Sequence, residues 1–257
     1  YVQFMDGSDT LNPLATEEMY NQALKSEADI VVMGSQRSSR LLGVKIPYFT
    51  PSRVLKKETT DTRELLPIIL GRHGFSFSLV DKLFQRDLLK KINPLAEVNF
   101  HGEDFLTTIR IFSNNLKLSY TDYVGYNWTM GGRSTSMKYD KTWQEDKFLY
   151  GLCDDLLKEL GLTDKKYKEA VAKGLADSFI NNIAHYIANP LRSKEKISNW
   201  IKECLADSVW KTVSPLLDSE KYKAIKDKDE VSLLLQATEK YKASQLFYTV
   251  MQFYRYL

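Results

Sequence analysis

The chain has 257 residues, of which 43% are hydrophobic, and its formal net charge is +3. This length suffices for one large domain or two small ones, and the small, dispersed charge, together with the lack of an aromatic-basic RNA motif, argues against nucleic-acid binding. No apolar run reaches membrane-spanning length, and Cys153 and Cys204 lie far apart without the spacing of metal ligands, which is typical of buried thiols in a reducing compartment.

The first thirteen residues, YVQFMDGSDTLNP, place two acids directly after a short apolar run. The run is typical of a buried strand, and Asn12 followed by Pro13 is a favourable start for a helix. We therefore expect Asp6 and Asp9 in a loop between the carboxyl end of a strand and a helix, where open α/β sheets bind ligands. Because Asp, Gly and Ser are also ordinary turn residues, a purely structural turn is an equal alternative on spacing alone.

The next elements continue an α/β pattern. A helix over residues 13–26 and an apolar strand over residues 29–34 complete a βαβ-like unit, which favours parallel pairing of its two strands. Residues 35–60 alternate basic and apolar side chains around two prolines, as in an extended excursion or a hairpin, and a helix is expected near residues 61–70.

A second acidic segment lies further along the chain. Residues 78–89 (SLVDKLFQRDLL) are expected to be helical in their second half, and a short predicted strand at 98–101 runs into the helix GEDFLTTIRIF. Glu103 and Asp104 stand in the first turn of that helix, where the helix dipole alone would favour carboxylates. Residues 116–129 are rich in Tyr, Val and Trp and predict a further strand.

From about residue 140 the pattern becomes helical. Amphipathic stretches follow one another with no strand pattern, so we expect an α/β region over residues 1–138 and an all-α region over residues 139–257. An apolar stripe in the last stretch packs into a core or, given its aromatic residues and Arg255, attaches to a membrane interface. Its members are Leu235, Thr238, Tyr241, Leu246, Val250 and Phe253.

Four segments, in the right order over residues 1–137, resemble bacterial family 2 glycosyltransferases. YVQFMDGSDTLNP is similar to their Y-[IV]-x-F-[LM]-D-x-D-D-x-L-x-P segment, and SLVDKLFQRDLL to their K-L-[FY]-x-R-x-L-L motif. GEDF is similar to their E-D motif, and YVGYNWTMGGRSTSM to their Y-x-Y-x(3–5)-R-x-S-x-[ST] strand and loop. The resemblance implies part of the mixed sheet of the glycosyltransferase A fold, with flanking helices, and an inverting nucleotide-sugar transferase.

The resemblance also implies roles for single residues. Asp6 matches the first acid of the family's D-x-D, which lies near the donor's ribose and its metal-bound diphosphate. Ser8 stands where the family usually has the direct metal ligand, and Asp9 matches the acid after it. Because a hydroxyl is a weak ligand beside a carboxylate, either Asp9 takes over the Mg²⁺ or Mn²⁺, or metal binding is weak, or activity is impaired.

The remaining matches concern the acceptor and the leaving group. Asp104 matches the general base of inverting members, and Glu103 would support the site. Arg133 and Ser134 match a loop that resembles a diphosphate-contacting lid, where a cation offsets leaving-group charge. Lys82 is interpreted as structural or acceptor-side, and a lone His101 more often packs or lies at the surface than holds a metal.

The expected function is transfer of a sugar from a nucleotide-sugar, foremost a UDP-sugar, to a saccharide or lipid-linked acceptor in bacterial surface polysaccharide synthesis. A cytoplasmic location, peripheral contact with the inner face of the membrane and a homodimer are compatible with this expectation. The alternatives are an impaired relative that binds saccharide or protein, suggested by Ser8, and a glycoside hydrolase that uses paired acids without nucleotide or metal.

The family's first half, with the strand P-x-[YF]-N and the acid that reads the nucleotide base, has no counterpart in these residues. We therefore expect the chain to be a fragment whose first strand has an open far edge, to be covered by a second copy, a helix or an upstream segment. The 257 residues alone are expected to show neither saturable nucleotide-sugar binding nor transfer.

Overall fold

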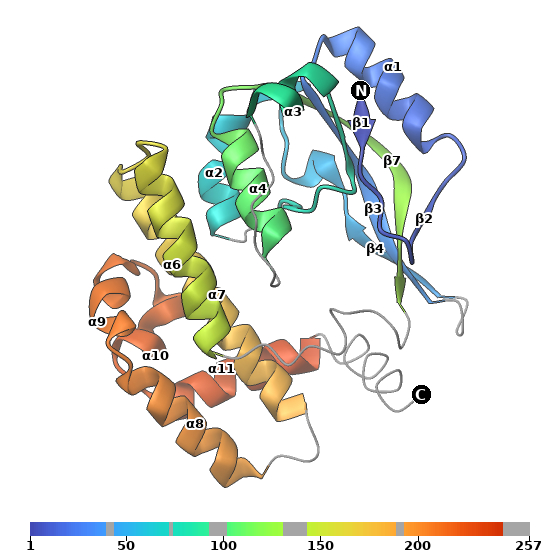
Figure 1. The fold of residues 1–257 in the computed structure, drawn as a ribbon. Helices are drawn as coiled ribbons and strands as arrows, with labels where there is room; N and C mark the ends of the chain where they lie inside the picture. Colours follow the sequence, from blue (N-terminus) through green and yellow to red (C-terminus); the bar gives the residue numbers. More distant parts are fainter. Residues whose placement is uncertain (40–43, 72–73, 93–101, 131–142, 189–192, 244–257) are drawn as a thin grey trace. The chain divides into compact units, whose positions relative to one another are not determined.

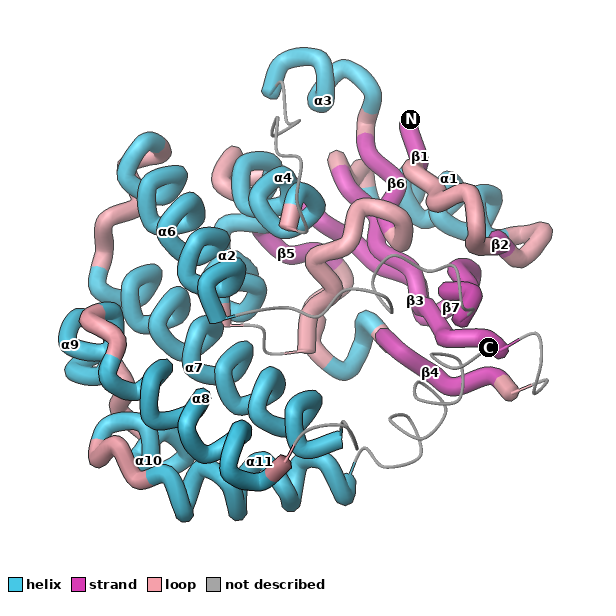
Figure 2. The backbone as a smooth tube through the Cα atoms, turned by 60° about the horizontal axis from the view of Figure 1, so that its bottom comes forward, coloured by secondary structure: helices cyan, strands magenta, loops and turns pink. Residues whose placement is uncertain are grey.

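The computed structural model describes residues 1–39, 44–71, 74–92, 102–130, 143–188 and 193–243. The chain forms two compact units, Tyr1–Ser134 and Thr135–Leu257. In Figure 1 and Figure 2 the described strands belong to the first unit, and the second unit shows helices. The predicted fold class, a mixed sheet with flanking helices followed by a helical C-terminal region, is confirmed.

A seven-stranded mixed sheet forms the centre of the first unit. Its main path runs β1–β6–β3–β7–β2, with β4 paired to β3 and β5 paired to β7. β3 and β7 pair in parallel, whereas the other strand pairs described are antiparallel. The strands are β1 (Val2–Gln3), β2 (Thr10–Leu11), β3 (Ile30–Ser39), β4 (Lys45–Phe49), β5 (Thr59–Asp61), β6 (Lys82–Phe84) and β7 (Lys117–Met130).

Helices cover both faces of this sheet (Figure 1). On one face α1 (Ala15–Ser26) packs its buried residues Ala15, Met19 and Ala23, four apart along one side of the helix, into a cluster with Val31 and Met33 of β3. On the other face lie α2 (Thr62–Leu70) and α4 (Glu103–Phe112), and α3 (Arg86–Ile92) follows β6. The apolar face predicted for α4, formed by Phe105, Ile109 and Phe112, is fully buried.

The predicted hairpin and two of the helix predictions hold with shifted ends. β3 continues to Ser39 and pairs with β4 as an antiparallel hairpin, and α2 begins after Asp61, whose side chain accepts a 2.7 Å hydrogen bond from the Arg63 amide. The first helix starts at Ala15 rather than residue 13. Asn12 does not cap it with its side chain, because that amide donates to the Val124 carbonyl and accepts from Asn127 on β7.

Several sheet features were not predicted, among them the short strands β2 and β5. The two strands of the predicted βαβ-like unit, β1 and β3, do run in the same direction, but they are not neighbours, because β6 lies between them and is antiparallel to both. The pattern of residues 78–89 indicated only its helical half, which is α3. The first half contains β6, which has only three residues and begins with a lysine, and so short a segment shows no strand periodicity in the sequence. The strand expected at 98–101 falls outside the described residues.

The second unit is a helical assembly around an aromatic core. Trp143 on the first helix stacks on Trp210 with ring centroids 5.0 Å apart, and Phe179 packs against both rings. The helices are α6 (Trp143–Glu159), α7 (Lys165–Ala188), α8 (Lys194–Ala206), α9 (Val209–Val213), α10 (Lys223–Lys226) and α11 (Glu230–Ala243). Among the described helices, none combines the length and apolar character that crossing a membrane requires.

The apolar stripe predicted for the last stretch is wrong for Leu235 and holds for Tyr241. Leu235 is 63% exposed, whereas Leu233 and Ala237 of α11 are buried in the core, with Tyr241 packed beside them. These three residues are four apart, so one face of the helix carries them, and Leu235 lies off that face. The rest of the predicted stripe, from residue 246 on, lies outside the described residues.

Gly125 on β7 is required by the close approach of α1. A Cβ at this position would meet the Ala15 Cβ at 2.8 Å and also the sulfur of Met33. We therefore expect Gly125→Ala to lower the free energy of unfolding of the first unit by about 1–3 kcal/mol, as overpacking in a filled core does. Gly7→Ala is the matched control, since nothing lies within 4 Å of its added Cβ. Equal stability of the two variants in urea unfolding would contradict this packing.

Candidate active site

Three strands of the first unit end at the same edge of the sheet. β6 is antiparallel to both β1 and β3, so β1 and β3 run in the same direction, and β7 is parallel to β3. Figure 1 shows the connection from β1 to β2, the first turn of α4 and the carboxyl end of β7 along this edge. This is the edge at which open α/β sheets bind ligands, and both predicted acidic segments lie there.

The loop between β1 and β2 is anchored to β7 through Asp9. Asp9 is 7% exposed, and its carboxylate accepts two hydrogen bonds, from the Tyr126 hydroxyl at 2.7 Å and from the Thr129 amide at 2.8 Å. The same hydroxyl accepts a 3.2 Å bond from the Asp6 amide, and the Asp9 amide donates to the Asp6 carbonyl at 3.1 Å. Asp9 is thus the structural anchor of the loop.

Burial raises the pKa of Tyr126 far above its usual value, and the hydrogen bond to Asp9 raises it further. The phenol therefore keeps its proton over the whole physiological range. A protonated phenol can donate to Asp9 while its oxygen accepts from the Asp6 amide, so both bonds of the anchor persist together.

Asp6 differs from Asp9 because it is exposed, as are Gly7 and Ser8 beside it. The Asp6 carboxylate makes no hydrogen bond within the described part of the chain. Partial loss of hydration raises the pKa of Asp6, and the negative charges of Asp9 and then Glu103 raise it further. Since Asp6 and Glu103 belong to the two acidic segments, their electrostatic coupling shows that the fold brings these segments together.

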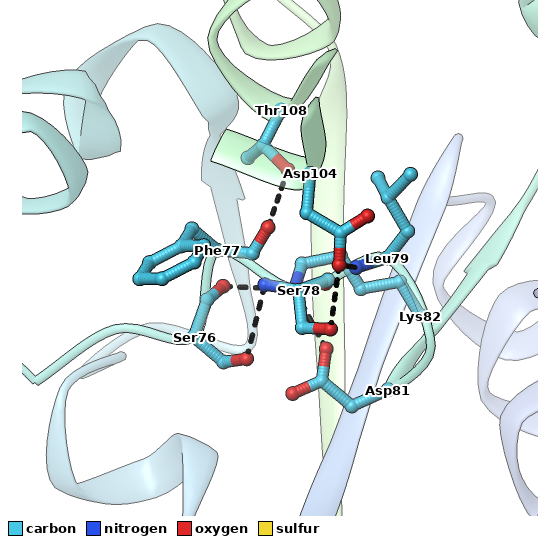
Figure 3. Close-up of polar contacts among 8 residues, drawn as sticks. All are labelled: Ser76, Phe77, Ser78, Leu79, Asp81, Lys82, Asp104 and Thr108. Carbon is cyan, nitrogen blue, oxygen red and sulfur yellow. Dashed lines mark hydrogen bonds and ion pairs between the residues drawn. The ribbon is translucent and has the colours of Figure 1, made fainter. Parts of the chain in front are cut away.

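The second segment begins at Gly102, whose φ of 137° is a conformation that favours glycine. Glu103 is exposed, and its carboxylate accepts a 3.0 Å bond from the Gly102 amide. Asp104 is half-buried, and its Oδ2 accepts from the Ser78 hydroxyl at 3.1 Å and from the Leu79 amide at 3.4 Å (Figure 3). One oxygen of Asp104 is held in this way, and its Oδ1 makes no hydrogen bond among the described residues.

Several groups act on the pKa of Asp104. Burial raises this pKa, the bonds from Ser78 and Leu79 lower it, and the nearby charges of Glu103 and Lys82 act in opposite directions. The net effect is a pKa above the usual value for an aspartate. A carboxylate with a raised pKa is a stronger base than a solvated one, and such shifts are concentrated at functional sites.

The sequence did not reveal the segment that holds Asp104. Lys82 is fully buried, which agrees with the structural interpretation of its motif, and its ammonium donates to the carbonyls of Ser76 and Ser78 and to the Asp81 carboxylate. Two serines near a lysine carry no recognisable spacing. The only available signal was the pair of charged residues, Asp81 and Lys82, within an otherwise largely apolar run at 78–84.

Not every predicted site residue can be placed. Arg133, Ser134 and His101 lie outside the described residues. Among the residues that are described, no group of three or more His, Cys, Asp or Glu side chains is placed to hold a metal ion by itself. Mg²⁺ is commonly held by one or two carboxylates together with substrate phosphates rather than by a complete protein cage, and Asp6 offers such a carboxylate.

The raised pKa of Asp6 predicts a stability effect. Above its usual pKa of 3.8, the ionised carboxylate is less favourable in the folded unit than in the unfolded chain. Asp6→Asn should therefore raise the melting temperature at pH 7, and the gain should vanish as the pH falls through the folded pKa of Asp6. Glu17→Gln is the control, because it removes the same charge from the first turn of α1, where a carboxylate is favourable. An unchanged melting temperature of Asp6→Asn at pH 7 would refute the predicted cost of the ionised Asp6 carboxylate in the folded unit.

No protein-family model and no curated protein sequence matches this chain. Solved structures do match. The crystal structure of Staphylococcus aureus TarS, residues 1–349, aligns with a TM-score of 0.54 and 16% sequence identity, over 95% of this chain and 66% of that one. The structure of the same TarS segment in complex with UDP-GlcNAc gives the same TM-score and identity, with 68% of its chain covered.

A third TarS structure, in complex with UDP, aligns with a TM-score of 0.53 and 16% identity, over 95% of this chain and 67% of that one. This chain therefore spans about two thirds of the length of the TarS segment that it matches. TarS is a glycosyltransferase. At this identity the likeness concerns the fold alone, and the chain therefore shares its fold with a glycosyltransferase.

Proposed function

We propose that this chain carries the acceptor and metal side of an inverting, family 2-like glycosyltransferase, which transfers a sugar from a nucleotide-sugar donor to a saccharide or lipid-linked acceptor. One observation carries the proposal. Asp104 stands half-buried at the start of α4, with a raised pKa and one oxygen without a hydrogen bond among the described residues, on the ligand-binding edge of a glycosyltransferase fold.

The chemistry assigned to Asp104 is general-base catalysis. The acceptor's hydroxyl oxygen forms a bond to the anomeric carbon of the donor sugar while the bond from that carbon to the diphosphate oxygen breaks. The hydroxyl proton moves to the Asp104 carboxylate, and the nucleoside diphosphate leaves with the electron pair of the broken bond. Attack from the face opposite the leaving group inverts the configuration. Glu103, exposed beside Asp104, is assigned a supporting role at the acceptor side.

The donor side is assigned to the loop that carries Asp6. Its carboxylate is exposed, and the charged groups that act on its pKa are the acids Asp9 and Glu103. This excess of negative charge fits a bound Mg²⁺ or Mn²⁺, which Asp6 would hold together with the donor diphosphate, with Asp9 next to it. Such a cation supplies charge neutralisation for the leaving diphosphate. Arg133 and Ser134 are proposed as further diphosphate contacts.

The proposed donor is a UDP-sugar, because TarS, which has the same fold, has been crystallised with UDP-GlcNAc and with UDP. The proposed setting is surface polysaccharide synthesis in a bacterium, on the cytoplasmic side and in peripheral contact with the membrane. Dimerisation is part of the proposal, since it would cover β1, which ends the main path of the sheet.

A specific observation favours a second candidate, a catalytically impaired relative that binds saccharide or protein. Ser8 replaces the acid that the family's pattern places there, and both carboxylate oxygens of Asp9 are already bonded to β7. These bonds leave Asp6 as the exposed carboxylate of the loop. A glycoside hydrolase is less favoured, because the chain shares its fold with TarS, which has been crystallised with UDP-GlcNAc, and nucleotide-independent hydrolysis would identify it.

Replacing the proposed base should remove transfer and leave the fold intact. In the full-length protein, we expect Asp104→Asn to lower kcat about 100- to 10,000-fold, the range that general-base catalysis contributes. The donor KM and the melting temperature should change little. Transfer is measured as UDP release from UDP-GlcNAc and other UDP-sugars with a panel of saccharide acceptors. Asp87→Asn, an exposed acid on α3, is the matched control, and near-normal turnover of Asp104→Asn would exclude the assigned role.

Removal of the divalent cation should separate the two candidates. For an active transferase, chelation with EDTA should abolish UDP release, Mn²⁺ should restore it, and Ser8→Asp should reduce the Mn²⁺ concentration needed for half-maximal activity, since it adds a carboxylate ligand. An impaired relative would bind saccharide without UDP release at any Mn²⁺ concentration. Activity that responds neither to EDTA nor to Asp6→Ala would show that the loop is only a turn.

A further inference from the structure

A fully buried ion pair lies next to the proposed base. The Lys82 ammonium and the Asp81 carboxylate are 2.7 Å apart, and both side chains are 0% exposed. Taking two charges out of water is costly, and apolar residues of similar volume often stabilise a fold at least as well. Folding stability alone therefore explains the presence of this ion pair poorly. The hydrogen bonds that the pair makes indicate a different role.

The ammonium of Lys82 has three N–H donors, and the structure gives it three acceptors. These are the Ser76 carbonyl at 2.8 Å, the Ser78 carbonyl at 2.5 Å and the Asp81 carboxylate at 2.7 Å. Each donor can therefore be satisfied. Because the acceptors come from both ends of a short segment, the ammonium fixes the loop of residues 76–81 in one conformation (Figure 3).

This loop is attached to α4 at two places. The Ser78 hydroxyl and the Leu79 amide donate to Oδ2 of Asp104, and the Thr108 hydroxyl donates to the Phe77 carbonyl at 2.7 Å. Asp104 and Thr108 are four residues apart and so lie on the same face of the helix. Figure 3 shows the loop between the buried pair and α4, with all of these side chains in one cluster.

The buried pair is itself fixed by the sheet. The Asp81 carbonyl accepts from the Met33 amide at 3.0 Å, and β6, which begins at Lys82, pairs with both β3 and β1. β1 leads directly to Asp6. β6 therefore fixes both Lys82 and the start of the loop that carries Asp6. In this way one strand sets the positions of the two acidic segments of the site.

We propose that Lys82, neutralised by Asp81, is a positioning residue for catalysis, which holds the 76–81 loop so that Ser78 and Leu79 fix one oxygen of Asp104 and leave the other to accept the acceptor's proton. This inference rests on the proposed function, because it takes Asp104 as the base. The inference adds the buried pair Asp81 and Lys82, which lies outside the two acidic segments, to the residues on which turnover depends.

The test is the double variant Asp81→Asn/Lys82→Met. It removes one positive and one negative charge from adjacent positions, so net charge is kept and no buried charge is left unpaired. In the full-length protein, we expect kcat to fall about 100-fold, the loss that a displacement of about 1 Å can cause, with the donor KM nearly unchanged. Lys90→Met with Asp87→Asn, which removes an exposed ion pair from α3, is the matched control and should leave kcat unchanged.

The pH profile supplies a readout in which Ser78→Ala is the specific variant. The bonds from Ser78 and Leu79 lower the pKa of Asp104, and so does the charge of Lys82, so the double variant raises this pKa both by releasing the loop and by removing that charge. The base is active when deprotonated, and the acid limb of the kcat profile should therefore move to higher pH. Ser78→Ala removes one of these bonds directly and should move the limb in the same direction.

A cycle with Ser78→Ala tests whether the pair acts through the loop. If it does, Ser78→Ala should add little to the double variant, because the bond is already lost, whereas independent effects would add. Amide hydrogen exchange at Leu79 gives a measurement that needs no activity, since release of the loop should speed exchange there. If the methionine version does not fold, Asp81→Asn/Lys82→Gln keeps hydrogen-bonding groups in the buried site and replaces it.

The outcomes separate this inference from the proposed function. A folded double variant with normal kcat, an unmoved acid limb and unchanged Leu79 exchange, in a protein inactivated by Asp104→Asn, would overturn the positioning role alone. Faster Leu79 exchange together with a shifted acid limb would support it. Turnover that survives Asp104→Asn would instead remove the proposed base, and the role of Lys82 in positioning it would fall as well.

Discussion

The burial of a lysine at the start of β6 is the constraint on which the proposed site depends. An ammonium in a sheet interior must find acceptors for all of its protons, and Lys82 finds them in its own approach loop and in Asp81. The loop cannot relax without breaking one of these bonds. Because the same three-residue strand pairs with β1 and β3, the conformation of the loop and the course of the chain into Asp6 are fixed together.

Around this rigid centre the site concentrates negative charge. The pKa of Asp6 is raised by partial loss of hydration and, after that, by the negative charges of Asp9 and Glu103. A fold selected for stability alone would separate these carboxylates. Their gathering at the carboxyl edge of the parallel strands is the arrangement expected where a cationic partner completes the site, and functional sites commonly carry such unfavourable terms.

The sequence predicted best where periodicity extends over many residues. The long strand β7, the hairpin of β3 with β4 and the buried face of α4 follow from alternation and from helical spacing, and the structure has all three. The sequence predicted the structure least well where contacts between residues far apart in the chain determine the local conformation. Asn12 leaves its capping position because β7 supplies partners for its amide, and β6 forms because two other strands accept it on either side. The serine that holds Asp104 is 26 residues away in the chain, a contact that no local pattern encodes.

The anchoring of Asp9 has a consequence for how mutations in this loop are interpreted. Removing its carboxylate would delete one negative charge and, in the same step, release the loop from Tyr126 and Thr129. An alanine at this position thus combines a change of charge with a change of backbone freedom, and no single assay separates the two. Tyr126→Phe isolates the change in backbone freedom, since it removes the hydrogen bonds of the Tyr126 hydroxyl to Asp9 and Asp6 without altering the charge. Asp6→Asn isolates the change in charge, because the Asp6 carboxylate makes no hydrogen bond in the described part of the chain.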